Sequence, residues 1–357
     1  MKIGIITFHD TSNFGSYLQT YGLYKKIIDL GYQCDIIDYQ CNSIIEREVI
    51  SPFKFTLNPR LILIELLINR ITRKKYKNLL NLLHSSMSLS ERVDRSNIKT
   101  VENCYDKYFV GSDIVWGLDI TKNDTTYFLD FVLNNKKKFA FASSIGNPWS
   151  NEEKQLVKSY LKDFEGIAVR EDESADWVEE LIDKRPHIVC DPTMLLKANE
   201  WSSLASSKYE GKKFILVYFP TKESLKAAKA YSEKYKLPIY VINYSLPIKG
   251  VKNIKPLTLA DFLSLFLNST FVLTGSYHGM LFSLYFNREF SYFNRAHKSR
   301  MNTIANKLGV QDRDGNEYNV LNMQSIDYIS VNKAIENYRN ISINILNIFL
   351  ENEKNDL

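Results

Sequence analysis

The residue with the clearest catalytic potential is His278, which follows an apolar run ending at Thr274 and precedes Gly279 at the start of a helix-like pattern. Histidine exchanges protons near neutrality, so in a strand-to-helix turn it is suited to general acid or base catalysis. The alternative is a histidine that only hydrogen-bonds to its own loop, which the flanking glycines make less common. His278 is therefore a candidate general acid or base.

Cationic residues follow two other predicted strands. Arg170 closes the strand 166–170, where its planar guanidinium could hold a carboxylate or a phosphate. The alternative is an ion pair with one of the acidic residues 171–173. Arg295 and Arg300 lie among other basic residues after a later strand, which suggests an acidic ligand, although a solvated basic turn would have the same composition.

The loop 9–16 brings Asn13, Gly15 and Ser16 to the start of a predicted helix. Free backbone N–H groups and the helix dipole favour an anion at such a position. The alternative is an N-cap by Ser12 or Asn13, with the glycine permitting a tight turn. The histidine that opens the loop could contact a ligand, but a solvated loop histidine is the more common case.

Small polar residues also follow two strands further along the chain. Ser112 and Asp113 come after the strand 105–111, and Ser144 ends the strand 138–144. Their side chains could hold sugar hydroxyls, whereas capping of the next turn would explain the same residue types. We predict that all three contribute to substrate binding.

All these residues lie just after a predicted strand. β-branched apolar runs alternate with helix-period patterns over residues 1–40, again over 100–190, and in a second series over 213–308. Such alternation builds parallel sheets, which bind ligands at the carboxyl ends of their strands. The pattern predicts an α/β fold with two parallel-sheet domains that face one another across a cleft.

A length of 357 residues also favours two domains. The predicted N-terminal domain covers 1–205 and contains a helical insertion at 42–100. The C-terminal domain covers 206–330, and a C-terminal helix and tail follow at 331–357.

The composition limits the classes of partner that the protein is expected to bind. Lys and Arg exceed Asp and Glu by 46 to 41, a net charge of +5 that does not demand nucleic acid. The four cysteines have no zinc-ligand spacing, so neither a metal site nor a disulfide framework is expected. No apolar run approaches the ~20 residues of a spanning helix, and no export signal is evident. We therefore expect a cytoplasmic protein.

One segment could still contact a membrane. Residues 61–77 join an apolar stretch to a basic one, as in helices that lie on the inner face of the plasma membrane. The five cations concerned are Arg70, Arg73, Lys74, Lys75 and Lys77. The alternative is a helix that packs on the first domain and leaves a solvated basic end.

The sequence resembles the polysaccharide pyruvyl transferases. The resemblance extends from residue 1 to about 313 and rests on short motifs in a fixed order: Asn13–Gln19, Val110–Trp116, Val169–Ser174, Cys190–Thr193, Ser276–Gly279, and Arg300 ahead of Leu308-Gly309. One position departs from the pattern, because many members have arginine two residues before the histidine, where this chain has Ser276.

The resemblance implies two Rossmann-like domains arranged as in the GT-B glycosyltransferases. It implies transfer of a pyruvyl group from phosphoenolpyruvate to a sugar of a cell-surface or capsular polysaccharide, or to a lipid-linked precursor, without a further cofactor. His278 matches the family's histidine, and Arg170 would anchor the donor. Arg295 and Arg300 would hold its second anionic group, and either they compensate for Ser276 at the substrate site or the donor differs.

Two other functions fit the same sequence features. One is a glycosyltransferase of the same architecture that uses a nucleotide sugar. The other is a non-catalytic saccharide-binding or scaffold protein of envelope assembly, in which His278 would have no part in turnover.

Overall fold

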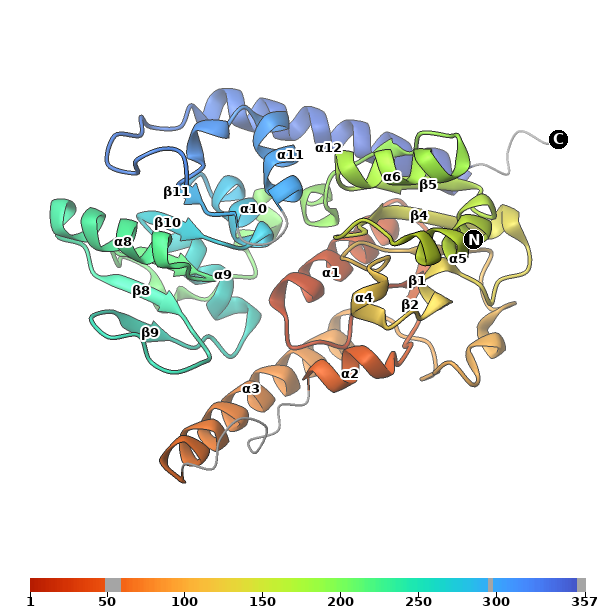
Figure 1. The fold of residues 1–357 in the computed structure, drawn as a ribbon, viewed down its shortest axis with the longest axis horizontal. Coiled ribbons are helices and arrows are strands. Elements are labelled where there is room, and N and C mark those ends of the chain that lie inside the picture. The colour runs from red at the N-terminus through yellow and green to blue at the C-terminus, as the bar shows by residue number, and fades with distance from the viewer. Residues whose placement is uncertain (49–58, 295–297, 352–357) are drawn as a thin grey trace. The chain divides into compact units, whose positions relative to one another are not determined.

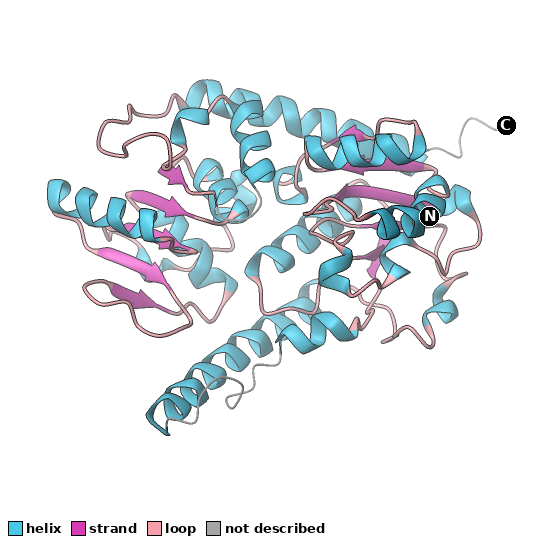
Figure 2. Ribbon diagram, in the orientation of Figure 1, coloured by secondary structure: helices cyan, strands magenta, loops and turns pink. Residues whose placement is uncertain are grey.

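The computed structural model describes residues 1–48, 59–294 and 298–351 (Figure 1). The chain divides into two compact units. Unit 1 comprises Met1–Val49, Leu80–Leu196 and Glu336–Leu357, and unit 2 comprises Ile50–Leu79 and Lys197–Ile335. Each unit consists of one parallel sheet and the helices around it, and Figure 2 shows the strands in magenta and the helices in cyan.

Unit 1 is built on a six-stranded sheet in which every strand pair is parallel. Its central strands are buried along their whole length, so their near-continuous apolar sequences are those of a sheet covered on both faces. In sheet order the strands are β2 (Gln33–Ile36), β1 (Lys2–Ile6), β3 (Lys107–Val110), β4 (Lys138–Ser143), β5 (Gly166–Val169) and β6 (His187–Ile188).

Two helices of unit 1 begin at side-chain caps. Asn13 caps the first helix, and Ser150 and Glu153 form a capping box at another, so unpaired N–H groups there have side-chain acceptors. The helices are α1 (Phe14–Asp29), α2 (Asn42–Glu48), α4 (Leu118–Thr121), α5 (Asn151–Lys162) and α6 (Asp172–Ile182), with 3₁₀ turns at Ile98–Val101, Thr125–Phe128, Asn135–Lys137 and Pro192–Leu195.

Unit 2 contains a five-stranded sheet that is also parallel throughout. In sheet order the strands are β11 (Glu289–Tyr292), β10 (Phe271–Thr274), β7 (Ile215–Tyr218), β8 (Ile239–Ile242) and β9 (Lys252–Ile254). The helices are α7 (Ala198–Ser202), α8 (Lys222–Tyr235), α9 (Leu259–Asn268), α10 (Tyr277–Tyr285) and α11 (Lys298–Leu308), with 3₁₀ turns at Ser207–Tyr209 and Gln311–Arg313.

Two long helices include residues of both units: α3 (Pro59–Ser86) and α12 (Tyr328–Glu351). The last turn of α12 is fixed in unit 1 by Lys107, a fully buried lysine on β3. Its Nζ donates to the carbonyl oxygens of Phe349 and Leu350 at 2.9 and 3.0 Å. A cation at a helix C-terminus also complements the helix dipole, so this lysine stabilises the end of α12.

The prediction of an α/β fold with two parallel sheets is confirmed. The boundaries differ at the expected insertion 42–100, because residues 50–79 belong to unit 2. Asn78 Nδ2 donates to the carbonyl oxygen of Leu257 at 3.0 Å, which accounts for part of this placement. The edge strand β9 was not predicted from the sequence, because it has three residues and only one of them is apolar.

Close packing between α1 and the 3₁₀ turn Pro192–Leu195 gives a first test. A Cβ added at Gly22 would lie 2.4 Å from the Pro192 carbonyl oxygen, a backbone atom that cannot turn aside. We expect Gly22→Ala to destabilise the protein by about 1–3 kcal/mol, although alanine is the better helix former. Ile28→Ala, on the exposed part of α1, is the control and should change the free energy of unfolding by less than ~1 kcal/mol. Urea unfolding measures both; a Gly22→Ala protein as stable as wild type would contradict the packing.

Candidate functional site

The loop after β3 meets the first turn of α1 in unit 1. Ser16 Oγ donates to Asp113 Oδ2 at 2.7 Å, so two predicted site residues from different loops are in contact. Asp113 has a φ of +79°, a left-handed conformation that is uncommon for a residue with a Cβ. Asn13 accepts from the Gly15 N–H at 2.9 Å, which shows that the capping interpretation is correct for Asn13.

The two serines predicted to bind sugar hydroxyls are buried in this structure. Ser112 Oγ accepts from Arg170 Nη1 at 3.3 Å, and its carbonyl oxygen accepts from Thr7 Oγ1 at 2.7 Å. Ser144 is also fully buried, although its Oγ makes no hydrogen bond to the described residues. In this structure the Ser112 hydroxyl therefore contacts the arginine beside it, and direct contact of Ser112 with a substrate stays a prediction.

Arg170 is not an exposed anion anchor. Its side chain is 1% exposed, with Nε donating to Glu171 Oε1 at 2.7 Å and Nη1 to Asp191 Oδ2 at 2.9 Å. The ion-pair alternative is therefore the observed one, with Asp191 as a second carboxylate that sequence proximity could not reveal. These contacts tie the ends of β5 and β6 together, so we assign Arg170 a positioning role.

Asp191 links this ion-pair group to the next turn. Its Oδ1 accepts from the Thr193 N–H at 2.9 Å and from Thr193 Oγ1 at 2.7 Å, which caps the 3₁₀ turn that packs against Gly22. Two of the motifs on which the resemblance rests, Val169–Ser174 and Cys190–Thr193, thus meet in one buried group. Their shared function in unit 1 is to hold the strand ends in register.

A second polar group at these strand ends joins the loop histidine, His9, to Asp38 and Arg92, two residues that the sequence analysis did not single out. The ring nitrogens of His9 lie 3.1 Å from Thr7 O and from Asp38 Oδ1, and Arg92 Nε donates to Asp38 Oδ2 at 3.1 Å. Burial alone would raise the pKa of Asp38, but the His9 ring and Arg92 outweigh it and lower that pKa to about 2. His9 is thus a buried partner of Asp38 and not a solvated histidine.

In unit 2 the predicted site residues lie where β10 passes into α10. Ser276 is the N-cap of α10, and its Oγ accepts from the Gly279 N–H at 3.3 Å. The Ser276 N–H in turn donates to Thr274 Oγ1 at 3.0 Å. A Cβ at Gly279 would lie 2.3 Å from that Thr274 oxygen, so only glycine lets the helix start so close to the strand.

His278 is the second residue of α10 and is half-buried. Its Nε2 is shielded from solvent, and its ring lies 5.5 Å, edge to face, from the ring of Tyr277. The first N–H groups of a helix have no acceptor within the helix, so an anion beside His278 would meet the positive end of α10. His278 is therefore placed beside an anion-favouring helix terminus.

Two aromatic residues at the end of β7 were missed by the sequence analysis. Burial raises the pKa of Tyr218, and a hydrogen bond with the Ser276 side chain partly offsets this rise. The next residue, Phe219, has a φ of +53° and a side chain that is 39% exposed. A bulky residue in this conformation is strained, and strain of this kind gathers at functional sites.

The two remaining cations predicted for the site are Arg300 and Arg295. Arg300 lies in the first turn of α11 and is half-buried, with its Nε shielded from solvent. Arg295 lies outside the described residues. Asn294 Nδ2, at the end of β11, donates to Asn302 Oδ1 and Asp314 Oδ2 at 3.2 and 3.0 Å.

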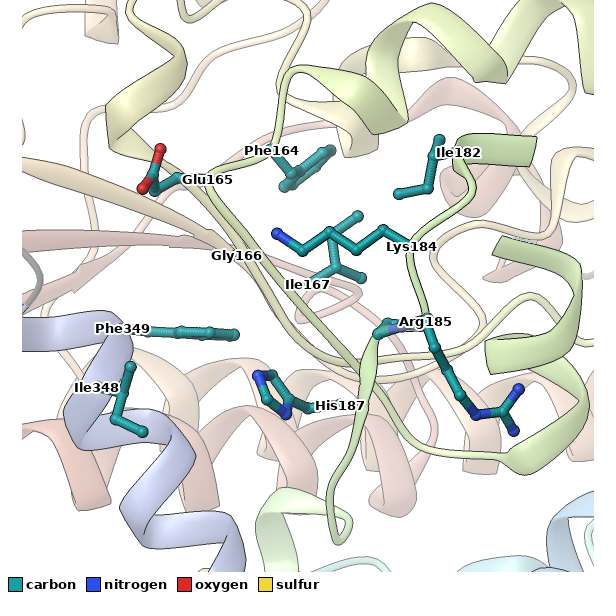
Figure 3. A pocket seen from close by; sticks show the side chains of 11 residues that line it. Phe164, Glu165, Gly166, Ile167, Ile182, Lys184, Arg185, His187, Ile348 and Phe349 are labelled. Carbon is teal, nitrogen blue, oxygen red and sulfur yellow. The ribbon is translucent and has the colours of Figure 1, made fainter. Parts of the chain in front are cut away.

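A cavity of about 290 Å³ lies elsewhere, at the amino-terminal ends of β5 and β6 in unit 1 (Figure 3). Phe164, Ile167 and Phe349 form much of its apolar lining, and Lys184 and His187 contribute nitrogen atoms. None of the predicted site residues lines it. Because the candidate residues follow the carboxyl ends of the strands, this cavity is a separate feature.

The two parallel sheets define an α/β fold, and solved structures of the GT-B fold are similar to it. A UDP-GlcNAc 2-epimerase from Neisseria meningitidis, bound to UDP-GlcNAc, is 12% identical, with a TM-score of 0.50 over 97% of this chain and 99% of its own. A proposed UDP-N-acetylglucosamine 2-epimerase from Listeria monocytogenes is 11% identical, with a TM-score of 0.53 over 99% and 97%. At such identities the likeness concerns the fold alone.

The family follows from the sequence itself. The family model described as polysaccharide pyruvyl transferase matches residues 13–297, which is most of the chain. The protein belongs to the polysaccharide pyruvyl transferase family. A comparison with curated proteins gave no match.

The buried ion pairs of Arg170 predict a large loss of stability without them. Arg170→Met leaves Glu171 and Asp191 buried without their cation, which should lower the free energy of unfolding by about 3–5 kcal/mol. Adding Glu171→Gln and Asp191→Asn removes the unpaired charges and should restore much of the loss. Urea unfolding of the single and triple variants measures both. If Arg170→Met instead keeps its stability and loses only ligand affinity, the positioning role is refuted.

The strained backbone at Phe219 predicts an unusual substitution. Phe219→Gly removes a ring that packs 4.8 Å from Tyr218, but it also relieves a left-handed conformation that costs ~1–2 kcal/mol. We expect its free energy of unfolding to stay within ~1 kcal/mol of wild type. Phe219→Ala loses the ring and keeps the strain, so it should be clearly less stable than Phe219→Gly. Equal stability of the two variants would argue against strain.

Proposed function

We propose that this protein transfers the pyruvyl group of phosphoenolpyruvate to two hydroxyls of one sugar and forms a cyclic ketal. The sugar belongs to a cell-surface or capsular polysaccharide or to its precursor, with a lipid-linked saccharide among the candidates. The observation that supports this proposal is the family match, which includes the strand-end residues of unit 1 and the start of α10 in unit 2. Because phosphoenolpyruvate is made inside cells, the reaction would take place in the cytoplasm.

The reaction balances without a further cofactor. One sugar hydroxyl adds to C2 of phosphoenolpyruvate while C3 gains a proton and becomes a methyl group. The bond between C2 and the phosphate oxygen then breaks as the second hydroxyl attacks C2, and inorganic phosphate leaves. The two hydroxyls release two protons, of which one replaces the proton taken up at C3 and the other leaves with the phosphate.

His278 is the proposed proton carrier. The reaction needs a group that can both give a proton to C3 and take one from a hydroxyl, and histidine does either near neutrality. His278 is half-buried at the start of α10, so part of this residue stays accessible to a bound reactant. The amino-terminal end of α10 would hold the carboxylate or the phosphate of the donor beside it.

The serine at position 276 is consistent with this arrangement. A serine caps α10, whereas arginine has no acceptor for the Gly279 N–H. In this chain the backbone of the helix terminus would therefore supply part of the positive potential that many members obtain from an arginine side chain. We propose Arg300 as the cation that supplies the rest, together with Arg295. Phe219 would offer its exposed ring to the sugar.

The experiment is incubation with phosphoenolpyruvate and a panel of free and lipid-linked saccharides. The proposal expects release of inorganic phosphate together with an acceptor that gains one pyruvic acid less one water. Turnover of a nucleotide sugar instead would indicate the glycosyltransferase function. Saccharide binding without turnover of either donor would indicate a non-catalytic binding protein, and both results would contradict the proposal.

The catalytic role of His278 gives its own prediction. His278→Gln should lose at least ~10²-fold in kcat, the usual effect of removing a positioned general acid or base, with its unfolding free energy near wild type. His187→Gln is the matched control, because that exposed histidine lies at the amino-terminal end of β6 and should leave kcat unchanged. A folded His278→Gln protein with wild-type kcat would refute the assignment.

A further inference from the structure

From Leu66 onward, the helix α3 has one buried face and one exposed face, and the two differ in chemistry. Its inner face is held within unit 2 at two places. Lys75 is 7% exposed and its Nζ lies 4.1 Å from the ring centroid of Tyr244, a cation–π contact. Asn78 hydrogen-bonds to Leu257 as described above, so the orientation of this stretch of helix is fixed.

The opposite face carries a basic stripe, which we define as Arg70, Arg73, Lys74 and Lys77. All four residues are exposed. At about 100° per residue they fall within roughly one third of the helix circumference, together with Leu66. In the described part of the chain none of the four has an ion-pair partner, and no described carboxylate lies on this face of α3. The stripe therefore presents uncompensated positive charge.

This geometry corrects the set of cations expected from the sequence. Lys75 is one of the five basic residues in the segment 61–77, but it points inward to Tyr244 and cannot reach a surface outside the protein. The other four are separated by three, one and three residues along the chain, which is the spacing that places them on one side of a helix. In a helix that merely ends in solvated basic residues, the cations would have no reason to share one side of the helix.

Exposed apolar residues adjoin the stripe. Leu66 is 45% exposed and Leu67 is 54% exposed, one turn before Arg70. Leucines that stay in water have a free-energy cost that burial in another phase would relieve. Apolar side chains at one end of a row of cations match the boundary between acyl chains and headgroups in a bilayer.

We propose that α3 docks this protein on the surface of an anionic membrane. The basic stripe binds lipid phosphates, while Leu66 and Leu67 enter the boundary between headgroups and acyl chains. The contact is peripheral: in the described part of the chain no helix is long and apolar enough to span a bilayer. The proposal does not depend on the pyruvyl transfer reaction, because it rests on α3 alone.

The test is co-sedimentation with vesicles of equal parts phosphatidylcholine and phosphatidylglycerol, compared with vesicles of phosphatidylcholine alone. We expect binding to the anionic vesicles only, and weaker binding as salt rises. Replacing the four residues of the basic stripe with glutamine should lower the partition coefficient by ~10²-fold or more. No binding by the wild-type protein, or equal binding by this variant, overturns the proposal.

A matched control distinguishes binding through the basic stripe from binding that follows the net charge of the protein. Lys222, Lys226, Lys229 and Lys236 are exposed lysines on and just after α8, a helix that also carries Glu223 and Glu233. Replacing these four with glutamine removes the same charge and should leave vesicle binding within ~3-fold of wild type. A loss equal to that of the stripe variant would show that binding follows total charge and would overturn the proposal.

The leucines distinguish a membrane from a soluble polyanion. Leu66→Ser with Leu67→Ser should weaken vesicle binding, because apolar contact with the bilayer is lost, and leave unchanged any retention on a heparin column. Both substitutions are at exposed positions, so the fold should be retained, which circular dichroism checks. If the leucine variant binds vesicles as wild type does, Leu66 and Leu67 do not enter the bilayer and the proposed docking geometry is overturned.

Discussion

In a parallel sheet every strand runs in one direction, so all the loops that follow strands leave the sheet at the same edge. Both units of this protein obey that constraint, and the rest of the candidate site depends on it. In unit 1 it brings Ser16 to Asp113 and Arg170 to Asp191, although each pair is well separated in sequence. In unit 2 it places Tyr218 from β7 beside Ser276 at the start of α10.

Strand ends that converge must also be held in place, and the buried charges of unit 1 do this. Arg170 with Glu171 and Asp191 joins the loops after β5 and β6, and His9 with Asp38 joins those after β1 and β2. Burying any one of these charges alone would have a large desolvation cost, and pairing with an opposite charge offsets that cost. Polar residues near a site are therefore of two kinds, those that face a ligand and those that shape the loops.

The sequence distinguishes these two kinds poorly, and Arg170 shows why. Alternating strand and helix patterns predicted both sheets correctly, because hydrophobic periodicity is a local property of the chain. The second carboxylate partner of Arg170, however, is 21 residues away, and only the sheet topology makes Asp191 its neighbour. The contact of Ser112 with Arg170, 58 residues along the chain, could not be predicted for the same reason. Phe219 left no signal at all, since a left-handed backbone at a phenylalanine is imposed by tertiary structure and not by residue type.

The start of α10 shows what an exception to the family pattern can mean. Serine at position 276 caps α10, and in the proposed mechanism the oriented backbone groups of this helix terminus would supply part of the positive potential beside His278. The proposed chemistry can be followed atom by atom with phosphoenolpyruvate labelled with carbon-13 at C2. We predict that NMR of the product shows the label in the acceptor as a ketal carbon bonded to two sugar oxygens. Label that remains in phosphoenolpyruvate or appears only in free pyruvate, with an acceptor that the protein binds, would contradict the account.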